Sequence, residues 1–461
     1  MKFIKSESIE IPEENPFLNC KLKREIYADN LTQIIEAYSG GFVLSVDNKW
    51  GSGKTTFIKM WEAQLKLLGY KTAYYNSWEN DFDVDPFVSI MSELKVLGAG
   101  EKQFEDLILK AGKFSTKLIP LLAKGVMTKA LGESTVNGLF EVLTAESSNF
   151  LAKQIDDFSN RKNSIINFKT QLTEYVSELS NSKPLIFFLD ELDRCRPDFA
   201  VLVLEKIKHL FNVPKIIFVL SIDKVQLSNS IKGYYGSESI DAKEYLRRFI
   251  DIEYSIPSPQ IDLYCKYLYE YYSLNLFFET ESRKTQYSVQ LDGDNLLKFA
   301  ITLSERLNLT IRIIEKLFLH TNLVVRQFSK DNYFFPITVF WLIYLRDQKN
   351  DQFIKLVNRD FGLTDFVNEF EQEFYSLINS GLENATSGGF TCLVTYYCNY
   401  LKERDADILL ENPNHTLNIK LKYFSDKRFV EKLGYMSKDS TKGLSIKYLL
   451  DRINLLENFK N

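Results

Sequence analysis

The chain has 461 residues, and its formal net charge of −4 comes from 57 Lys and Arg residues against 61 Asp and Glu residues. This length corresponds to roughly two to four domains. The near balance of charge excludes a strongly basic nucleic-acid coat and a disordered acidic tail protein. Five cysteines argue against a disulfide-stapled secreted domain, and three histidines argue against a histidine-based metal site. Because the first residues contain no apolar signal-peptide run, we expect a cytoplasmic protein.

In chain order, the first half alternates between helical and strand patterns. Apolar periodicity predicts an amphipathic helix over 25–37 and a second helix over 57–68. A long, mainly helical insert is predicted at about 87–178. Short apolar runs predict five strands, at Phe42–Val46, Thr72–Tyr75, Leu185–Leu189, Lys215–Ile222 and Ile250–Ile256. Strands that alternate with helices indicate an α/β fold, with a parallel five-stranded sheet covered by helices on both faces.

The second half is predicted to be mainly helical. Pro257-Ser258-Pro259 closes the α/β part, so we expect a core at 1–257, a helical lid at 258–330 and a mainly helical C-terminal domain at 331–461. We expect a break in the last of these at Ser387–Gly389. The apolar stretch Phe334–Leu345 is too short for a membrane span of about twenty residues, so it is predicted to be a buried helix or strand.

The segment that follows the first strand has the pattern of a phosphate-binding loop. Gly53-Lys54-Thr55 match three of its four fixed positions and open a helix directly behind a strand. Lys54 would reach the β- and γ-phosphates, and the Thr55 hydroxyl would bind Mg²⁺. Asn48 replaces the first glycine of the pattern, and asparagine tolerates left-handed dihedrals well. The alternative is a glycine-rich turn with an exposed lysine. We expect ATP and Mg²⁺ as ligands, with the nucleotide-binding residues Asn48, Lys49, Trp50, Gly51, Ser52, Gly53, Lys54, Thr55 and Thr56.

The third predicted strand supplies the second half of this site. It runs directly into Asp190 and Glu191, as in P-loop ATPases that hold Mg²⁺ and polarise water at such a strand end. Asp190 would contact the metal through water, and Glu191 would orient the attacking water as general base. A solvated charged turn is the alternative, and the phosphate-loop pattern upstream makes it the weaker interpretation.

The fourth predicted strand is consistent with the layout of additional-strand ATPases. It ends near Ser221, with Asp223 two residues later. A polar group at this place can contact the γ-phosphate or the lytic water, or it can serve as an ordinary helix N-cap. The sequence does not separate these two roles.

Several separated segments, in order, are similar to motifs of one known family, the KAP family of P-loop NTPases. The resemblance extends over roughly residues 10–325. Glu191 keeps a carboxylate where the family frequently has Asp, so hydrolysis stays the expectation. The similar segments are Lys49–Thr55, Tyr75–Trp78, Leu189–Pro197, Val219–Asp223 and Tyr245–Arg248.

This resemblance implies an AAA+/STAND-like P-loop ATPase that acts as a switch or assembly platform rather than a metabolic enzyme. Bacterial members are associated with exclusion of phages, so we expect antiphage defence. The expected partners are further copies of the chain and a separate effector protein or phage component. Two alternatives stay open. One is an ATP-binding scaffold with little hydrolysis, in signalling or at a membrane periphery. The other is a nucleic-acid translocase, which the charge of −4 does not indicate.

Three arginines could complete the site. Arg247 and Arg248 end the helix before the fifth strand, where related oligomeric ATPases carry an arginine that reaches a neighbour's nucleotide. Paired arginines on a helix are otherwise a solvated face. Arg312 lies at the start of a predicted lid helix, where it would contact the γ-phosphate or pair with Glu315 on the surface.

Many members of the family carry transmembrane helices between the phosphate loop and the Asp-rich strand. In this chain lysines interrupt that interval, and their insertion cost argues against a span. Four of them lie near one face of a predicted helix, which could be an interfacial membrane helix. We expect a solvated face of a helical insert instead of membrane contact through 107–129. The four lysines are Lys110, Lys113, Lys117 and Lys124.

Overall fold

The chain forms two compact units, Met1–Ser258 and Pro259–Asn461. The computed structural model describes residues 9–38, 40–97, 147–179, 183–287, 289–329, 333–378, 382–402, 421–424, 429 and 445–455, without the side chains of 147–161. The predicted insert helix at 107–129 lies outside these residues. The predicted lid region and the described C-terminal helices both belong to the second unit.

The first unit is built on a five-stranded sheet in which every strand pair is parallel. All five predicted strands are present, with ends that differ by at most two residues. The strand order is β2-β3-β4-β1-β5, so β4 lies between β1 and β3, as in the additional-strand layout. This order confirms the predicted fold class. The strands are β1 (Phe42–Asp47), β2 (Thr72–Asn76), β3 (Leu185–Asp190), β4 (Ile216–Ile222) and β5 (Ile252–Ser255).

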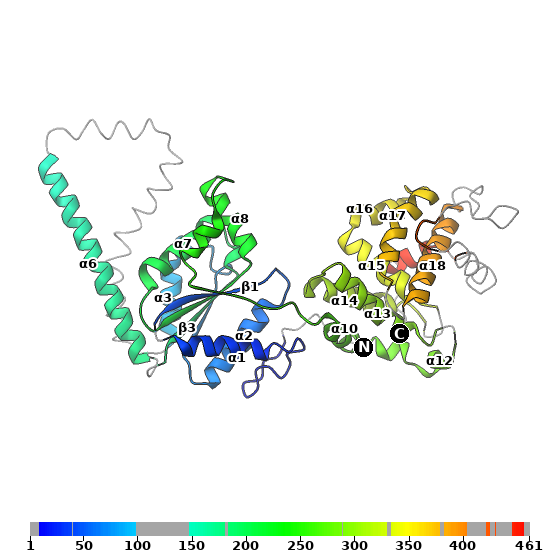
Figure 1. The fold of residues 1–461 in the computed structure, drawn as a ribbon, viewed down its shortest axis with the longest axis horizontal. Coiled ribbons are helices and arrows are strands. Elements are labelled where there is room, and N and C mark those ends of the chain that lie inside the picture. The colour runs from blue at the N-terminus through cyan, green and yellow to red at the C-terminus, as the bar shows by residue number, and fades with distance from the viewer. Residues whose placement is uncertain are drawn as a thin grey trace. The chain divides into compact units, whose positions relative to one another are not determined.

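Helices cover both faces of this sheet (Figure 1). The predicted helix over 25–37 is present as α1, and α2 begins three residues before the predicted start at Phe57. A turn of 3₁₀-helix at Leu192–Arg194 follows β3, and one turn of π-helix at Ile207–Phe211 continues α7. The described helices are α1 (Glu25–Ala37), α2 (Lys54–Leu67), α3 (Pro86–Val96), α6 (Ser147–Leu179), α7 (Pro197–Lys206), α8 (Lys224–Tyr235) and α9 (Ala242–Arg247).

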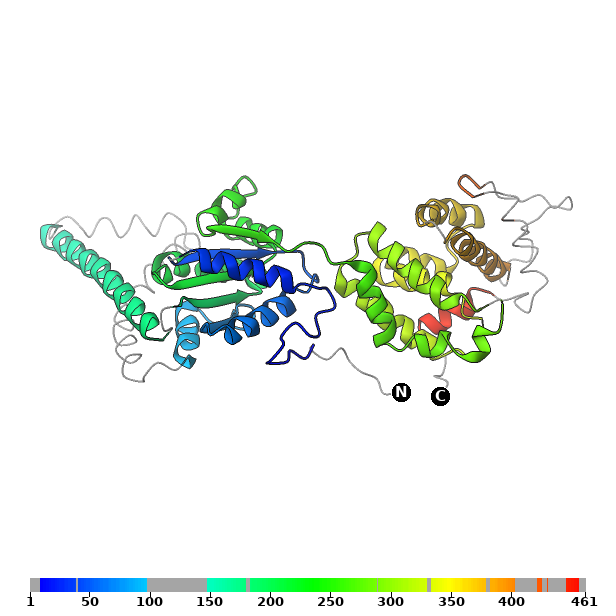
Figure 2. The ribbon, with the colours of Figure 1, turned by 60° about the horizontal axis from the view of Figure 1, so that its bottom comes forward.

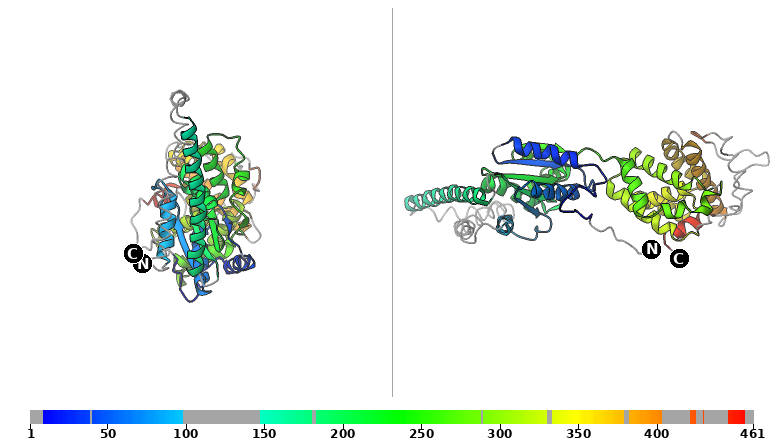
Figure 3. Two further views of the ribbon diagram at one scale, coloured as in Figure 1. Left: turned by 90° about the vertical axis from the view of Figure 1, so that its left-hand side faces the viewer. Right: turned by 90° about the horizontal axis from the view of Figure 1, so that it is seen from below.

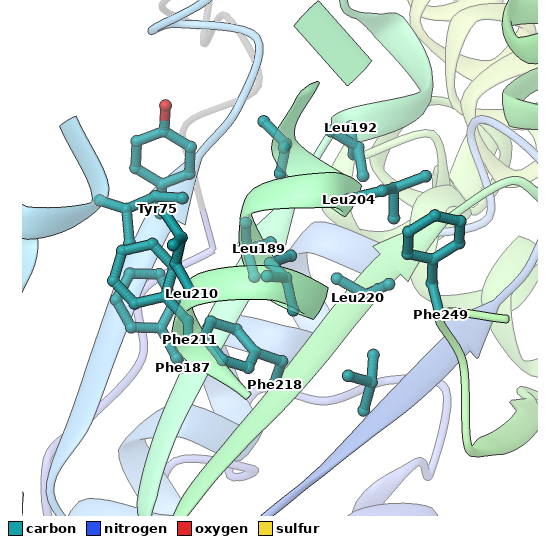
Figure 4. Close-up of a cluster of buried hydrophobic side chains, with 14 of the residues drawn as sticks. Tyr75, Phe187, Leu189, Leu192, Leu204, Leu210, Phe211, Phe218, Leu220 and Phe249 are labelled. Carbon is teal, nitrogen blue, oxygen red and sulfur yellow. The ribbon is translucent and has the colours of Figure 1, made fainter. Parts of the chain in front are cut away.

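Side-chain alternation along the strands divides the core of the first unit into two clusters. On one face, Ile186 and Phe188 of β3 pack with residues of α1 and α2, among them the buried Trp61. On the other face, α3, α6 and α7 pack on alternate residues of the two central strands (Figure 4). Because both faces are covered, every residue of β3 is buried, as expected for a strand inside a parallel sheet. The residues of the two central strands on this second face are Phe187, Leu189, Phe218 and Leu220.

In the second unit the described residues contain helices and no strand (Figures 2 and 3). These helices enclose a core rich in phenylalanine and tyrosine. They are α10 (Ile261–Tyr271), α11 (Asn275–Phe278), α12 (Glu281–Lys284), α13 (Asp292–Arg306), α14 (Ile311–Val325), α15 (Pro336–Gln348), α16 (Asn350–Asn358), α17 (Leu363–Ser376), α18 (Glu383–Lys402) and α20 (Lys447–Ile453).

The apolar stretch Phe334–Leu345 forms most of α15, and its residues from Pro336 onward are all buried. It therefore serves as a central core helix, which is one of the two predicted outcomes. Among the described residues, no helix combines the length and the apolar character that a membrane crossing requires.

The predicted break at Ser387–Gly389 is wrong, because this segment lies inside α18. Its glycine serves close helix packing instead. A Cβ on Gly389 would lie 2.6 Å from Cγ2 of Ile337 in α15, and the Gly389 carbonyl accepts a hydrogen bond from the Thr338 hydroxyl at 3.0 Å. The absence of a side chain lets α15 and α18 approach each other at this point.

Replacing Gly389 with Ala should destabilise the second unit by about 1–3 kcal/mol, because the buried Ile337 would have to move. Urea unfolding of the two proteins measures the difference. Gly233→Ala in α8 is the matched control. Its new Cβ would meet only Cγ of Pro197, at 3.9 Å. A helical alanine there should stabilise by up to about 1 kcal/mol. Equal stability of Gly389→Ala and the wild type would show that α15 and α18 do not need a residue without a side chain at this position.

Candidate functional site

The loop between β1 and α2 turns on two glycines. Gly51 and Gly53 have φ angles of 74° and 79°, in the left-handed region that glycine adopts without strain. Helix α2 begins at Lys54, directly after the second glycine. The first N–H groups of a helix have no partner within it, so they are free to bind an anion. The loop and the first turn of α2 thus have the backbone of a phosphate site.

Asn48 takes the place of the first glycine of the pattern for a reason that differs from the prediction. Its φ is not positive, so a left-handed backbone is not needed at this position. Its side chain fastens the loop instead. Nδ2 donates to the carbonyl of Ile256 at 3.1 Å, and Oδ1 accepts from the N–H of Lys49 at 2.8 Å. Asn48 therefore ties the loop to the end of β5.

Lys54 is only 9% exposed, and its ammonium group lies inside the loop. Nζ donates to the carbonyl of Asn48 at 2.6 Å and to that of Lys49 at 3.3 Å. Burial lowers the pKa of Lys54, and nearby carboxylates oppose this effect. The structure thus brings the loop lysine and the acidic strand ends together, as the sequence predicts. The carboxylates that act on Lys54 are Asp193, Asp223, Asp190 and Asp47.

Asp190 is the last residue of β3 and is 1% exposed. Its Oδ1 accepts from the N–H of Glu191 at 3.0 Å, and its Oδ2 accepts from the hydroxyl of Tyr74 at 2.9 Å. Burial raises the pKa of Tyr74, and the charge of Asp190 adds to this effect. The phenol therefore keeps its proton and donates the hydrogen bond to Asp190. The two hydrogen bonds hold Asp190 in one orientation. Each of its oxygens keeps further lone pairs for another ligand.

Glu191 leaves the strand in a left-handed conformation, with φ 60°. Asn76, at the end of β2, donates to its Oε2 at 3.3 Å, and Arg194 forms an ion pair with its Oε1 at 2.6 Å. Burial raises the pKa of Glu191, an effect that Arg194 opposes and the charge of Asp190 adds to. The carboxylate is thus a stronger base than an exposed glutamate, and it is held by two neighbours.

Trp50 joins the phosphate loop to the ends of two other strands. Its N–H donates to Oδ2 of Asp223 at 3.2 Å, and its indole Nε1 donates to Oδ2 of Asp193. Asp193 is 5% exposed, and burial raises its pKa, while the Trp50 hydrogen bond and Lys54 lower it. The loop is therefore braced against the segments that follow β3 and β4.

Ser221 and Asp223 have separate roles in the structure. Asp223 caps α8, since its Oδ1 accepts from the N–H groups of Val225 and Gln226. Ser221 is 1% exposed, and its buried hydroxyl has no hydrogen-bond partner among the residues that the structure describes. It lies in register with Asp190, which is itself paired with Asn76. The N-cap role therefore applies to Asp223, and Ser221 stays a candidate for contact with a ligand or water.

Residues 24–327 match the KAP family P-loop domain. The chain belongs to the KAP family of P-loop NTPases. The match confirms the predicted resemblance. It includes the whole sheet and continues through α10–α14 in the second unit. Because of this family match, the chain contains a nucleotide-binding NTPase domain. No curated protein matches the chain.

The site residues of this KAP domain fit a magnesium ion that arrives with a nucleotide. Thr55, in the first turn of α2, and Asp190 offer hard oxygen donors, which Mg²⁺ prefers. Among the described residues, no group of three or more His, Cys, Asp or Glu side chains is arranged to hold a metal by itself. Phosphate oxygens and water would therefore supply the other ligands, as is usual for Mg²⁺.

The three predicted arginines have exposed side chains. Arg247 ends α9 and forms an exposed ion pair with Glu244 at 3.1 Å, and Arg248 follows it. Both precede β5, which is an edge strand. Arg312, in the first turn of α14, lowers the pKa of Glu315, as a surface pair does, although burial keeps that pKa raised overall. This geometry is compatible both with contact to a nucleotide and with a role as surface charge, for all three arginines.

Four residues of the site were not predicted from the sequence. Tyr74 and Asn76 hold the two carboxylates at the end of β3, and Asp193 binds Trp50. Arg24, before α1, donates to carbonyls of the phosphate loop. One signal for the first pair was present, because alternate polar residues of β2 lie beside β3 in a parallel sheet. No pattern in the sequence points to Arg24.

Proposed function

We propose that this KAP domain binds ATP with Mg²⁺ and hydrolyses it, and that the protein works as a nucleotide-driven switch or assembly platform. One observation carries the proposal. The loop lysine Lys54, the buried Asp190 and the basic carboxylate Glu191 come together at the carboxyl ends of β1 and β3. Ligands of open α/β sheets bind at this edge of the sheet.

Each residue has a role that follows from its position. In this structure Lys54 donates to two loop carbonyls. Phosphate oxygens are stronger acceptors for an ammonium group, so Lys54 would bind them when a nucleotide is present. Glu191 would take a proton from the attacking water, for which a raised pKa is favourable. The buried hydroxyl of Ser221 could hold that water or the γ-phosphate. A bound Mg²⁺ would neutralise charge on the phosphates.

A second function, ATP binding with little hydrolysis, is favoured by one contact. The ion pair between Glu191 and Arg194 holds Oε1 at 2.6 Å, so the base is not free to orient water in this state. A scaffold would keep this pair after ATP binds, whereas an active ATPase would release it. Steady-state ATP hydrolysis by the wild type, with and without DNA or RNA, distinguishes the two functions and also tests for a nucleic-acid translocase.

The biological role is proposed from the resemblance of this chain to phage-excluding KAP proteins. We infer a cytoplasmic homo-oligomer that acts with a separate effector protein or phage component. The five cysteines lie at scattered spacings in the sequence, as is common in a reducing compartment. Expression with its neighbouring genes should protect bacteria from phage, and plaque counts measure the protection. Equal plaque counts with and without these genes would remove the defence proposal.

Lys54→Ala should weaken binding of MgATP by about tenfold to a hundredfold, since a charged hydrogen-bond donor to phosphate is lost. Isothermal titration calorimetry measures this affinity. Lys66→Ala is the matched control, because Lys66 lies on the same helix but forms only a surface ion pair with Glu62. Its loss should leave affinity unchanged. No binding of MgATP by the wild type would refute the proposed function itself.

A further inference from the structure

Arg24 lies immediately before α1 and is one of the most deeply buried charged residues, with 2% exposure. Its Nη1 donates to the carbonyl oxygen of Ser52 at 2.8 Å and reaches that of Gly53 at 3.4 Å. Both carbonyls belong to the phosphate loop. The guanidinium group therefore packs behind the loop.

This buried cation has no carboxylate partner among the described residues. Its Nε and Nη2 atoms are buried, and no atom in the described part of the chain forms a hydrogen bond with them. The ionisable neighbours that act on it are Cys20 and Tyr27, and burial lowers the pKa of Arg24. An arginine nevertheless stays protonated in proteins. Buried charges are normally paired, because an unpaired one is costly. The described residues thus supply no negative charge that compensates Arg24.

The two carbonyls that Arg24 binds determine where the loop amides point. In a trans peptide the C=O and the following N–H point in opposite directions, and the described chain contains no cis peptide bond. The Ser52 carbonyl turned toward Arg24 therefore directs the N–H of Gly53 away from it. In the same way, the Gly53 carbonyl directs the N–H of Lys54. These two N–H groups open the first turn of α2, where an anion binds.

We propose that Arg24 is a positioning residue of the phosphate site, which holds the loop amides toward the nucleotide and receives its compensating charge from the bound phosphates. This inference rests on the proposed function. The amides of such loops cradle the α- and β-phosphates, so the effect should be similar for ADP and ATP. It should be absent for adenosine, which has no phosphate.

Arg24→Met, which keeps a long apolar side chain, tests this proposal. Isothermal titration calorimetry with MgADP, MgATP and adenosine gives the three affinities. We expect MgADP and MgATP to bind about tenfold to a hundredfold more weakly than to the wild type, and adenosine to bind as before. MgADP should also raise the melting temperature of the variant less than that of the wild type at equal concentration.

Thr32→Val, in the helix α1 that follows Arg24, is the matched control. The Thr32 hydroxyl is buried and accepts a hydrogen bond from Nε1 of Trp61 at 3.0 Å, away from the loop. Its loss should lower stability and leave the MgADP affinity unchanged. Arg24→Lys keeps the charge but loses the planar fork, so it should lose about two- to tenfold in affinity. If Arg24→Met does not fold, the MgADP affinity of Arg24→Lys tests the proposal.

Wild-type affinity for MgADP in Arg24→Met, or in Arg24→Lys where only that protein folds, would overturn the proposal. A loss in Thr32→Val equal to that in the arginine variants would overturn it too, because the effect would then be one of stability alone. A wild type that binds neither MgADP nor MgATP would instead refute the proposed function.

Discussion

Glu191→Gln should bind MgATP as tightly as the wild type and hydrolyse it about 10²–10⁴-fold more slowly, the usual cost of losing a positioned base. The amide keeps the shape of the side chain, and its one oxygen can still accept a hydrogen bond from Arg194, so we expect the loop and Lys54 to stay in place. Single-turnover hydrolysis and calorimetric binding, measured on the same preparations, separate the two effects. A variant that hydrolyses ATP at the wild-type rate would show that Glu191 is not the base.

The matched control for this variant is Glu205→Gln. Glu205 lies on α7, and burial raises its pKa as it does for Glu191. The neighbours that act on it, His209 and Lys206, do not belong to the phosphate site. Turnover by Glu205→Gln should therefore equal that of the wild type.

The pH dependence of wild-type turnover gives an independent test of the base. Glu191 must be ionised to accept a proton, and burial raises its pKa. Turnover should therefore fall as the pH is lowered through this raised pKa. Arg194→Gln removes the opposing charge in the free enzyme, so the acidic limb of kcat/KM should move to higher pH. An unmoved limb would show that Arg194 does not set the pKa of the base.

Replacing both Arg247 and Arg248 with Ala should abolish most turnover and spare nucleotide affinity. An arginine supplied by a neighbouring subunit stabilises charge in the transition state and contributes about 10³–10⁵ in rate in well-studied cases. Both arginines are exposed at the end of α9, so their loss should hardly change stability. With an arginine supplied in this way, specific activity should rise with protein concentration, since an isolated subunit would have an incomplete site.

A mixing experiment identifies the source of the arginine. The double variant keeps Glu191, and Glu191→Gln keeps both arginines, so a mixed interface would contain one complete site. Mixtures should recover part of the wild-type turnover, whereas each variant alone stays inactive. Activity that is linear down to nanomolar enzyme, with no recovery on mixing, would support a monomeric switch in which these arginines are surface charge.

Much of the α/β unit was predictable because the relevant signals are local. The run Leu185–Leu189 predicts β3, since a strand inside a parallel sheet is apolar on both sides. The spacing of apolar residues over 25–37 predicts α1, because it places them on one face of a helix. Gly53-Lys54-Thr55 directly after an apolar run predicts the phosphate loop. Each of these signals lies within a few residues and reports what that segment does by itself.

The sequence by itself thus determined the five strands, the helices α1 and α2, and which residues lie at the ends of β1 and β3. The tertiary structure decided which side chains brace that chemistry. Trp50 binds Asp193 across 143 positions of the chain, and Arg24 reaches Ser52 across 28. Gly389 reads as a break, yet it lies inside α18, where its missing side chain leaves room for Ile337 of a distant helix. Local patterns report how strongly a residue favours burial or a turn, but a contact between distant segments exists only once the whole chain has folded.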